Sequence, residues 1–178
     1  LLGMVKDATL ADIDKDGDDD ILLVSEWGVL QILENTGGEF LKKTVFNKKG
    51  LWNTVYVDDL NGDGLQDILL GNHSINSRFG ASSEQPLKMY VNDMDDNGRL
   101  DQIITYDLNG VETIFADKKE LEKQLPYIRK KYNFSRDFAR ASVSDVFGKE
   151  KINKATIYEV DCLKNVYLLQ NGDGSFTA

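Results

Sequence analysis

The chain has few of the residues on which many enzymes and disulfide-rich folds depend. Its 178 residues include one cysteine, one histidine and two prolines. Cys162 alone excludes an internal disulfide, and His73 alone has no second histidine with which to form a zinc site or a proton relay. We find no nucleophile placed beside a base, so we expect a protein that is not an enzyme.

Long apolar runs and excess positive charge are also missing. No stretch approaches the roughly 20 apolar residues of a membrane-spanning helix. Lysine and arginine total 21 against 30 acidic residues, for a net charge of −9. Such a charge argues against a chain that binds nucleic acid. Hydrophobic residues make up 41% of the chain, which is enough to build a globular core.

The acidic residues are concentrated in three short segments. Fourteen of the 30 lie in residues 12–20, 58–67 and 93–101. Three nine-residue loops there share one template, with an acid at position 1, Asp or Asn at positions 3 and 5, Gly at 6 and Asp at 9. A short apolar strand follows each loop. We name them loop one (12–20), loop two (59–67) and loop three (93–101).

This template predicts a calcium site in each loop. Several carboxylates within nine residues repel one another unless a cation lies among them, and alternating oxygen ligands suit Ca²⁺. An EF-hand is excluded because its position 12 needs Glu, whereas these loops have Leu23, Leu70 and Ile104 there. An acidic turn without a metal remains the alternative. The main-chain carbonyl at position 7 is a further expected ligand, from Asp18, Leu65 and Arg99.

Two glycine-rich hairpins and the spacing of the loops indicate a repeat. Leu33–Phe40 and Leu169–Phe176 both combine an apolar strand end, a glycine-rich turn and a Phe that opens the next strand. Repeats of about 40–50 residues built from short strands are typical of propeller blades. We therefore predict a mostly β fold, a fragment of a β-propeller with about three four-stranded antiparallel blades. The expected parts are blade one at 1–47, blade two from 48 with a long loop at 71–86, and a third unit at 87–178.

Residues 117–148 follow a helical period instead. Apolar residues recur there at steps of three and four, and Asp117 with Glu120 forms a capping box. Pro126 is expected to divide the helix and Gly148 to end it. We therefore expect an α-helical insertion at 117–148 within the third unit. Its excess of basic residues favours a solvated outer face over an anion site.

The loops and hairpins resemble a known family. Asp at positions 1, 3, 5 and 9, then Ile-Leu, then Asn-Gly-Asp-Gly-Ser-Phe at 171–176 are similar to the FG-GAP/VCBS repeat of calcium-binding propellers in integrin α-subunits and secreted bacterial proteins. Gly50–Asp59 resembles the branch related to ASPIC/UnbV and cartilage acidic proteins. The resemblance covers most of 1–115 and 154–178. It implies that up to three Ca²⁺ ions are bound by Asp12, Asp14, Asp16, Asp20, Asp59, Asn61, Asp63, Asp67, Asp93, Asp95, Asn97 and Asp101.

The resemblance and the composition together suggest a binding or adhesion module for a protein or glycan. Weak calcium loops suit an extracellular, cell-surface or periplasmic location, where calcium is abundant. The alternative is an accessory, non-catalytic part of a carbohydrate-active enzyme. We also expect the chain to belong to a longer protein and its open strand edges to favour edge-to-edge self-association. The candidate ligand contacts are Trp27, for which packing is the stronger interpretation, and the loop residues His73, Arg78 and Phe79.

Overall fold

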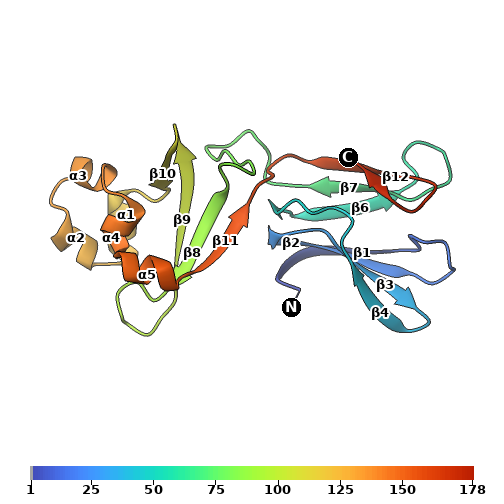
Figure 1. The fold of residues 1–178 in the computed structure, drawn as a ribbon, viewed down its shortest axis with the longest axis horizontal. Helices are drawn as coiled ribbons and strands as arrows, with labels where there is room; N and C mark the ends of the chain where they lie inside the picture. The colour runs from blue at the N-terminus through green and yellow to red at the C-terminus, as the bar shows by residue number, and fades with distance from the viewer. Residues whose placement is uncertain (1) are drawn as a thin grey trace. The chain divides into compact units, whose positions relative to one another are not determined.

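The chain folds into antiparallel sheets and one helical region (Figure 1). The computed structural model describes residues 2–178. They divide into two compact units. The first unit takes the residues up to 78 and then residues 160–178, and the inserted unit takes residues 79–159. Each unit has its own apolar core. The prediction of a mostly β fold is confirmed, and the arrangement of the sheets as propeller blades stays a prediction.

The first sheet is formed by the beginning of the chain. Its strand order is β1-β2-β3-β4, and β5 pairs with β2. Loop one joins β1 to β2, and Gly37 with Gly38, both at positive φ, makes the two-residue turn between β3 and β4. The strands are β1 (Met4–Ala11), β2 (Asp20–Gly28), β3 (Gln31–Thr36), β4 (Glu39–Lys43) and β5 (Gly50–Leu51).

The second sheet combines strands from both ends of the chain. Its order is β6-β7-β12-β13, so that β6 and β7 precede the inserted unit and β12 and β13 follow it. In the register, Ile68 pairs with Leu168, and both side chains are buried. The strands are β6 (Thr54–Asp58), β7 (Asp67–Gly71), β12 (Val166–Gln170) and β13 (Phe176–Thr177).

This pairing divides the chain differently from the expected blades. The sequence analysis places β12 and β13 in a third unit at 87–178, whereas their hydrogen bonds place them beside β7. The physical reason is burial, because Leu168 belongs to the core that also contains Leu22 of β2 and Leu70 of β7. The expected long loop at 71–86 is the connection at which the first unit passes into the inserted unit.

A tight contact around Trp52 holds the first unit's core together. The Trp52 side chain is fully buried, and its indole N–H donates a hydrogen bond to the Lys48 carbonyl. A Cβ on Gly50 would lie 2.4 Å from the Trp52 ring, so only glycine fits there.

β1 and β6 are joined by Asp7, whose Oδ2 accepts hydrogen bonds from the Thr54 hydroxyl (2.8 Å) and the Val55 amide (3.0 Å).

The inserted unit packs five short helices with the third sheet. The sheet order is β10-β9-β8-β11, and loop three joins β8 to β9. The core contains Tyr90 and Ile103 from the sheet and Leu121, Ile128 and Phe147 from the helices. The elements are β8 (Leu87–Asn92), β9 (Asp101–Leu108), β10 (Val111–Ile114), β11 (Thr156–Val160), α1 (Lys118–Gln124), α2 (Tyr127–Lys131), α3 (Ser135–Ala139), α4 (Val143–Phe147) and α5 (Lys149–Lys154).

The helix signals in the sequence are matched by the structure. Asp117 and Glu120 form a reciprocal capping box at α1, Pro126 separates α1 from α2, and Gly148 with φ 87° ends α4. The helices extend to residue 154, beyond the expected end at 148, because α5 begins directly after Gly148. The Lys131 ammonium donates to the carbonyls of Asp145 and Val146 in the last turn of α4, where a cation is favourable.

Candidate functional site

The three acidic loops share two left-handed backbone positions. Position 4 is left-handed in each, with φ of 64° at Lys15, 80° at Gly62 and 61° at Asp96. The position-6 glycines are left-handed as well, with φ between 80° and 97°. Two left-handed residues separated by one ordinary residue curl the chain around its own carboxylates. Three segments of different sequence thus make the same turn.

The carboxylate at position 1 binds the backbone inside the turn. In loop one the two oxygens of Asp12 accept hydrogen bonds from the amides of Asp16 and Gly17, both at 3.1 Å. Asp59 and Asp93 accept the equivalent bonds in loops two and three. Hydrogen bonds led by that from Gly64 hold the pKa of Asp59 below its usual value. Burial raises the pKa of Asp93, but bonds from Gly98 and Asn97 and the charge of Lys151 outweigh burial and lower it.

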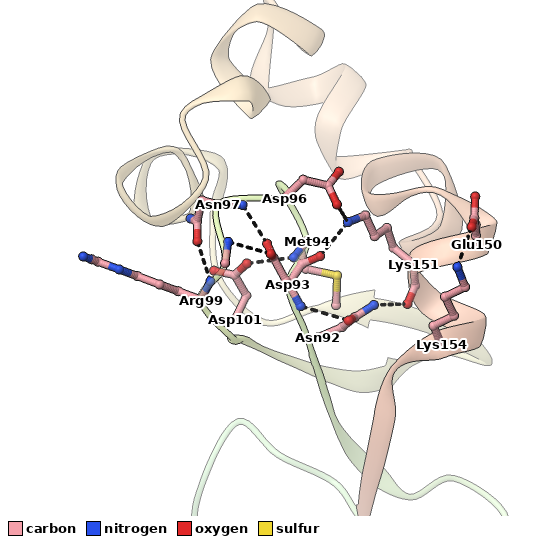
Figure 2. A network of polar contacts seen from close by, with 11 residues as sticks. Asn92, Asp93, Met94, Asp96, Asn97, Arg99, Asp101, Glu150, Lys151 and Lys154 are labelled. Carbon is pink, nitrogen blue, oxygen red and sulfur yellow. Dashed lines mark hydrogen bonds and ion pairs between the residues drawn. The ribbon is translucent and has the colours of Figure 1, made fainter.

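Positions 5 and 7 are linked to each other. The side-chain oxygen of Asp16, Asp63 or Asn97 accepts a hydrogen bond of 2.8–2.9 Å from the amide two residues later. This bond turns the position-7 residue, whose carbonyl is the expected ligand. The side chain at position 7 is not needed, and that of Arg99 points away from loop three (Figure 2). The ligand role of Asp18, Leu65 and Arg99 stays a prediction.

The acid at position 9 is buried and supports the fold. Asp20, Asp67 and Asp101 are 1%, 0% and 6% exposed. One oxygen of each accepts a hydrogen bond from the position-2 amide of its own loop, at 2.9–3.2 Å. The other oxygen reaches a different element: the Asn35 amide in β3, the Gln170 amide in β12 and the Gln124 side chain in α1.

Two of the loops bring three carboxylates within the span of one cation. Asp12, Asp14 and Asp16 each offer an oxygen, and these oxygens lie within 4.8 Å of one another. Asp93, Asp95 and Asp101 do the same in loop three. The Asp95 Oδ1 atom is buried and has no hydrogen-bond partner. A buried oxygen without a donor is costly unless a cation satisfies it, so the residues of loop three fit a divalent ion.

Loop two has an amide side chain, Asn61, at position 3, where loops one and three have an aspartate. The Asn61 side chain donates a hydrogen bond to Asp63 (2.9 Å), and its oxygen accepts one from the Asp63 amide (2.9 Å). The Tyr167 hydroxyl donates to Asp67 (3.0 Å). Burial and this bond raise the pKa of Tyr167. Loop two therefore offers carboxylates at positions 1, 5 and 9 and an amide oxygen at position 3.

Loop three is bound to the helices (Figure 2). The Lys151 ammonium of α5 donates to the Asp93 main-chain carbonyl (2.8 Å) and pairs with the carboxylate of Asp96. The Asn92 side chain donates to the Lys151 carbonyl (2.8 Å). From α1, the Gln124 amide donates to Asp101 (2.9 Å). Sequence reasoning missed Gln124 and Lys151, because their partners lie 23 or more residues away and no local pattern marks them.

The other candidate residues come from three segments: β2 and the parts of the 71–86 connection that belong to each unit. Trp27 lies in β2 at an irregular position between Glu26 and Gly28, with φ 58°, and is partly exposed. His73 and Arg78 belong to the first unit. Phe79 belongs to the inserted unit, where its ring packs on Phe115 with centroids 4.7 Å apart.

A cavity lies between the two sheets of the first unit. Its volume is about 410 Å³, and loop one, β3, β4 and the β12–β13 hairpin line it. Ile32, Val45 and Phe176 give it apolar walls, while Lys43 and Asp173 contribute charges. Gln170 fixes this region by donating to the Ile13 carbonyl (2.7 Å) and accepting from the Gln66 amide (3.0 Å). Such a mixture of apolar walls and a few polar groups suits a small polar ligand or a side chain of a partner.

Comparison with known families finds a match over part of the chain. Residues 12–70 match the model of the FG-GAP-like repeat. This stretch contains loops one and two, and the resemblance to that repeat is confirmed there; the ASPIC/UnbV branch stays a prediction. Neither the curated proteins nor the solved structures give a match. No helix within residues 2–178 has the length and apolar character needed to span a membrane.

Proposed function

Taking residues 12–70 as an FG-GAP-like repeat, we propose that this chain is a calcium-binding β-propeller segment of a secreted or surface protein and acts as a binding or adhesion module. The observation that carries the proposal is the shared geometry of the three loops. Each has the same two left-handed positions, the same position-1 acid bonded to the turn and the same buried acid at position 9.

The sheet topology supports a propeller. In the first and second sheets an antiparallel set of four strands follows in the order expected for a blade, with the acidic loop between its first two strands. β1 and β6, the first strands of the two sheets, lie next to each other through Asp7. On the second sheet Tyr56, Leu69 and Tyr167 pair across neighbouring strands and are 52%, 44% and 37% exposed. Such an apolar row suits packing against a further blade.

The ion-binding part of the proposal assigns roles to named positions. Carboxylate or amide oxygens at positions 1, 3 and 5 hold the Ca²⁺, with the position-7 carbonyl and an oxygen of the position-9 acid completing the set. Bound calcium neutralises charges that otherwise repel one another within each loop. Weak sites of this type fill at the calcium levels found outside cells, which supports a secreted location.

The binding part of the proposal rests on the cavity of the first unit. Its size and mixed lining suit a glycan or a peptide side chain. A glycan array followed by turnover assays on the bound oligosaccharides tests this. Binding without cleavage supports a binding module, whereas cleavage would make the chain a catalytic piece of a carbohydrate-active enzyme and would contradict the expectation that it is not an enzyme. Expected self-association of the chain stays a prediction, which light scattering tests.

Removal of calcium should destabilise the protein. A ligand at 100 times its dissociation constant adds about 2.7 kcal/mol per site to the folded state. Excess chelator should therefore lower the melting temperature. Magnesium should restore it poorly, because Mg²⁺ demands octahedral geometry. An unchanged melting temperature in chelator, with no calcium bound in a direct titration, would contradict the calcium assignment.

Two variants of loop one test the register. Asp16→Ala should remove one of the calcium equivalents and leave the others, since no ligand is shared between loops. Lys15→Ala, one residue away and off the ligand positions, should keep all equivalents. Equal losses in the two variants would show that the register is misassigned. Calcium counted per chain by titration is the readout.

A further inference from the structure

Lys151 places a fixed positive charge against loop three. Its ammonium donates to the Asp93 carbonyl and pairs with Asp96, and its side chain is 24% exposed (Figure 2). The two bonds reach the loop at positions 1 and 4. The Lys151 carbonyl is held in turn by the side chain of Asn92, the residue that precedes the loop. Hydrogen bonds thus hold both the side-chain ammonium and the main-chain carbonyl of Lys151, which keeps its positive charge beside the loop.

Position 4 distinguishes loop three from the other loops. It is Lys15 in loop one and Gly62 in loop two, both in the same left-handed conformation as Asp96. Only in loop three is this position an acid, and that acid pairs with a lysine from a helix 55 residues away. The Asp96 side chain points to Lys151 (Figure 2). The Lys151–Asp96 ion pair thus holds α5 against loop three without using an oxygen of the expected calcium ligands.

The positive charge of the Lys151 ammonium, which is bonded to the Asp93 carbonyl, would repel a cation bound among Asp93, Asp95 and Asp101. Like charges a few ångströms apart repel, and a divalent ion feels twice the repulsion of a monovalent one. The Asp95 oxygen that lacks a donor marks where the ion belongs, and the Lys151 ammonium does not fill that position. Lys151 therefore supports the loop from outside while opposing the ion inside.

Building on the proposed function, we propose that Lys151 sets the calcium affinity of loop three, lowering it relative to a loop without the helical contact. Lys151 contacts no ligand oxygen and acts on the calcium affinity through its positive charge. Because such coupling is reciprocal, calcium in loop three weakens the hold of Lys151 on the loop. The helical region and the third calcium site are then one coupled system, and loops one and two titrate independently of it.

The test is a calcium titration of the 178-residue chain followed by amide NMR. Gly17, Gly64 and Gly98 each donate their N–H to the position-1 acid of their own loop, so their signals report the three loops separately. The variant is Lys151→Gln, which removes the charge and keeps a hydrogen-bond donor. The matched control is Lys154→Gln, in the same helix, where the lysine pairs with Glu150 and not with the loop.

Lys151→Gln should tighten calcium binding at Gly98 by about threefold to tenfold at low salt, and the gain should shrink in concentrated salt. Gly17 and Gly64 should report unchanged affinities, and Lys154→Gln should resemble the parent at all three glycines. An unchanged or weakened affinity at Gly98, or an equal gain from Lys154→Gln, would overturn the proposal while leaving calcium binding intact. If calcium shifts none of the three glycines in the parent chain, the proposed function itself fails, and this inference falls with it.

Discussion

The ninth residue of each loop is an acid that the fold uses as a hydrogen-bond acceptor. Asp20 accepts from the amides of Ile13 and Asn35 and is almost completely buried. Removal of the Asp20 carboxylate leaves one buried and one partly buried amide donor without a partner, and each such loss costs about 1–3 kcal/mol. Sequence reasoning grouped this residue with the calcium ligands, and the structure adds a second role that does not depend on an ion.

Asp20→Ala should therefore lower the free energy of unfolding by about 2–4 kcal/mol even in excess chelator. Asp16→Ala should cost little under the same conditions, because without calcium its exposed carboxylate mainly repels its neighbours. Urea denaturation in chelator gives both values. Similar losses from the two variants would mean that positions 5 and 9 do not differ in role.

At the scale of elements, Asp7 makes the contact between β1 and β6 dependent on pH. Bonds from the Thr54 hydroxyl and then the Val55 amide lower the pKa of Asp7 below its usual value of 3.8. A lowered folded-state pKa adds stability that is present above the usual value and is lost as the pH falls through the folded value.

When the pH falls from about 6 to about 3, the free energy of unfolding should therefore decrease less for Asp7→Asn than for the parent. Denaturation in chelator at the two pH values measures this and keeps calcium out of the comparison. Glu39→Gln is the control, since Glu39 is exposed at the start of β4, and it should behave as the parent does. A parent-like acid response in Asp7→Asn would contradict the assigned role.

Local patterns predicted local structure well. The loop template, the Asp117–Glu120 cap and the break at Pro126 depend on residues a few positions apart, and the structure has all three. The pairing of β12 with β7 was not predictable in this way, because strands of similar apolar alternation compete for the same partner and the choice is made by the shared core. The contacts of Gln124 and Lys151 with loop three were missed because their partners lie 23 or more residues away in the sequence.

At the scale of the whole molecule, the two units have separate cores and should unfold separately. Both tryptophans, Trp27 and Trp52, lie in the first unit, whereas all the helices of residues 2–178 lie in the inserted unit. Tryptophan fluorescence and the helical circular dichroism signal should therefore give different denaturation midpoints. Calcium should shift both midpoints, because each unit contains at least one acidic loop. Superimposable curves would show one cooperative unit instead.

The split second sheet also has a consequence for synthesis on the ribosome. β6 and β7 emerge before the inserted unit, whereas β12, which also pairs with β7, emerges only after that unit. Until then the edge of β7 is unpaired and available to other strands, including those of neighbouring nascent chains. The inserted unit can form meanwhile, and its completion shortens the flexible chain that must be closed before β12 reaches β7. Slow translation between β7 and β12 would thus prolong the period in which mispairing occurs.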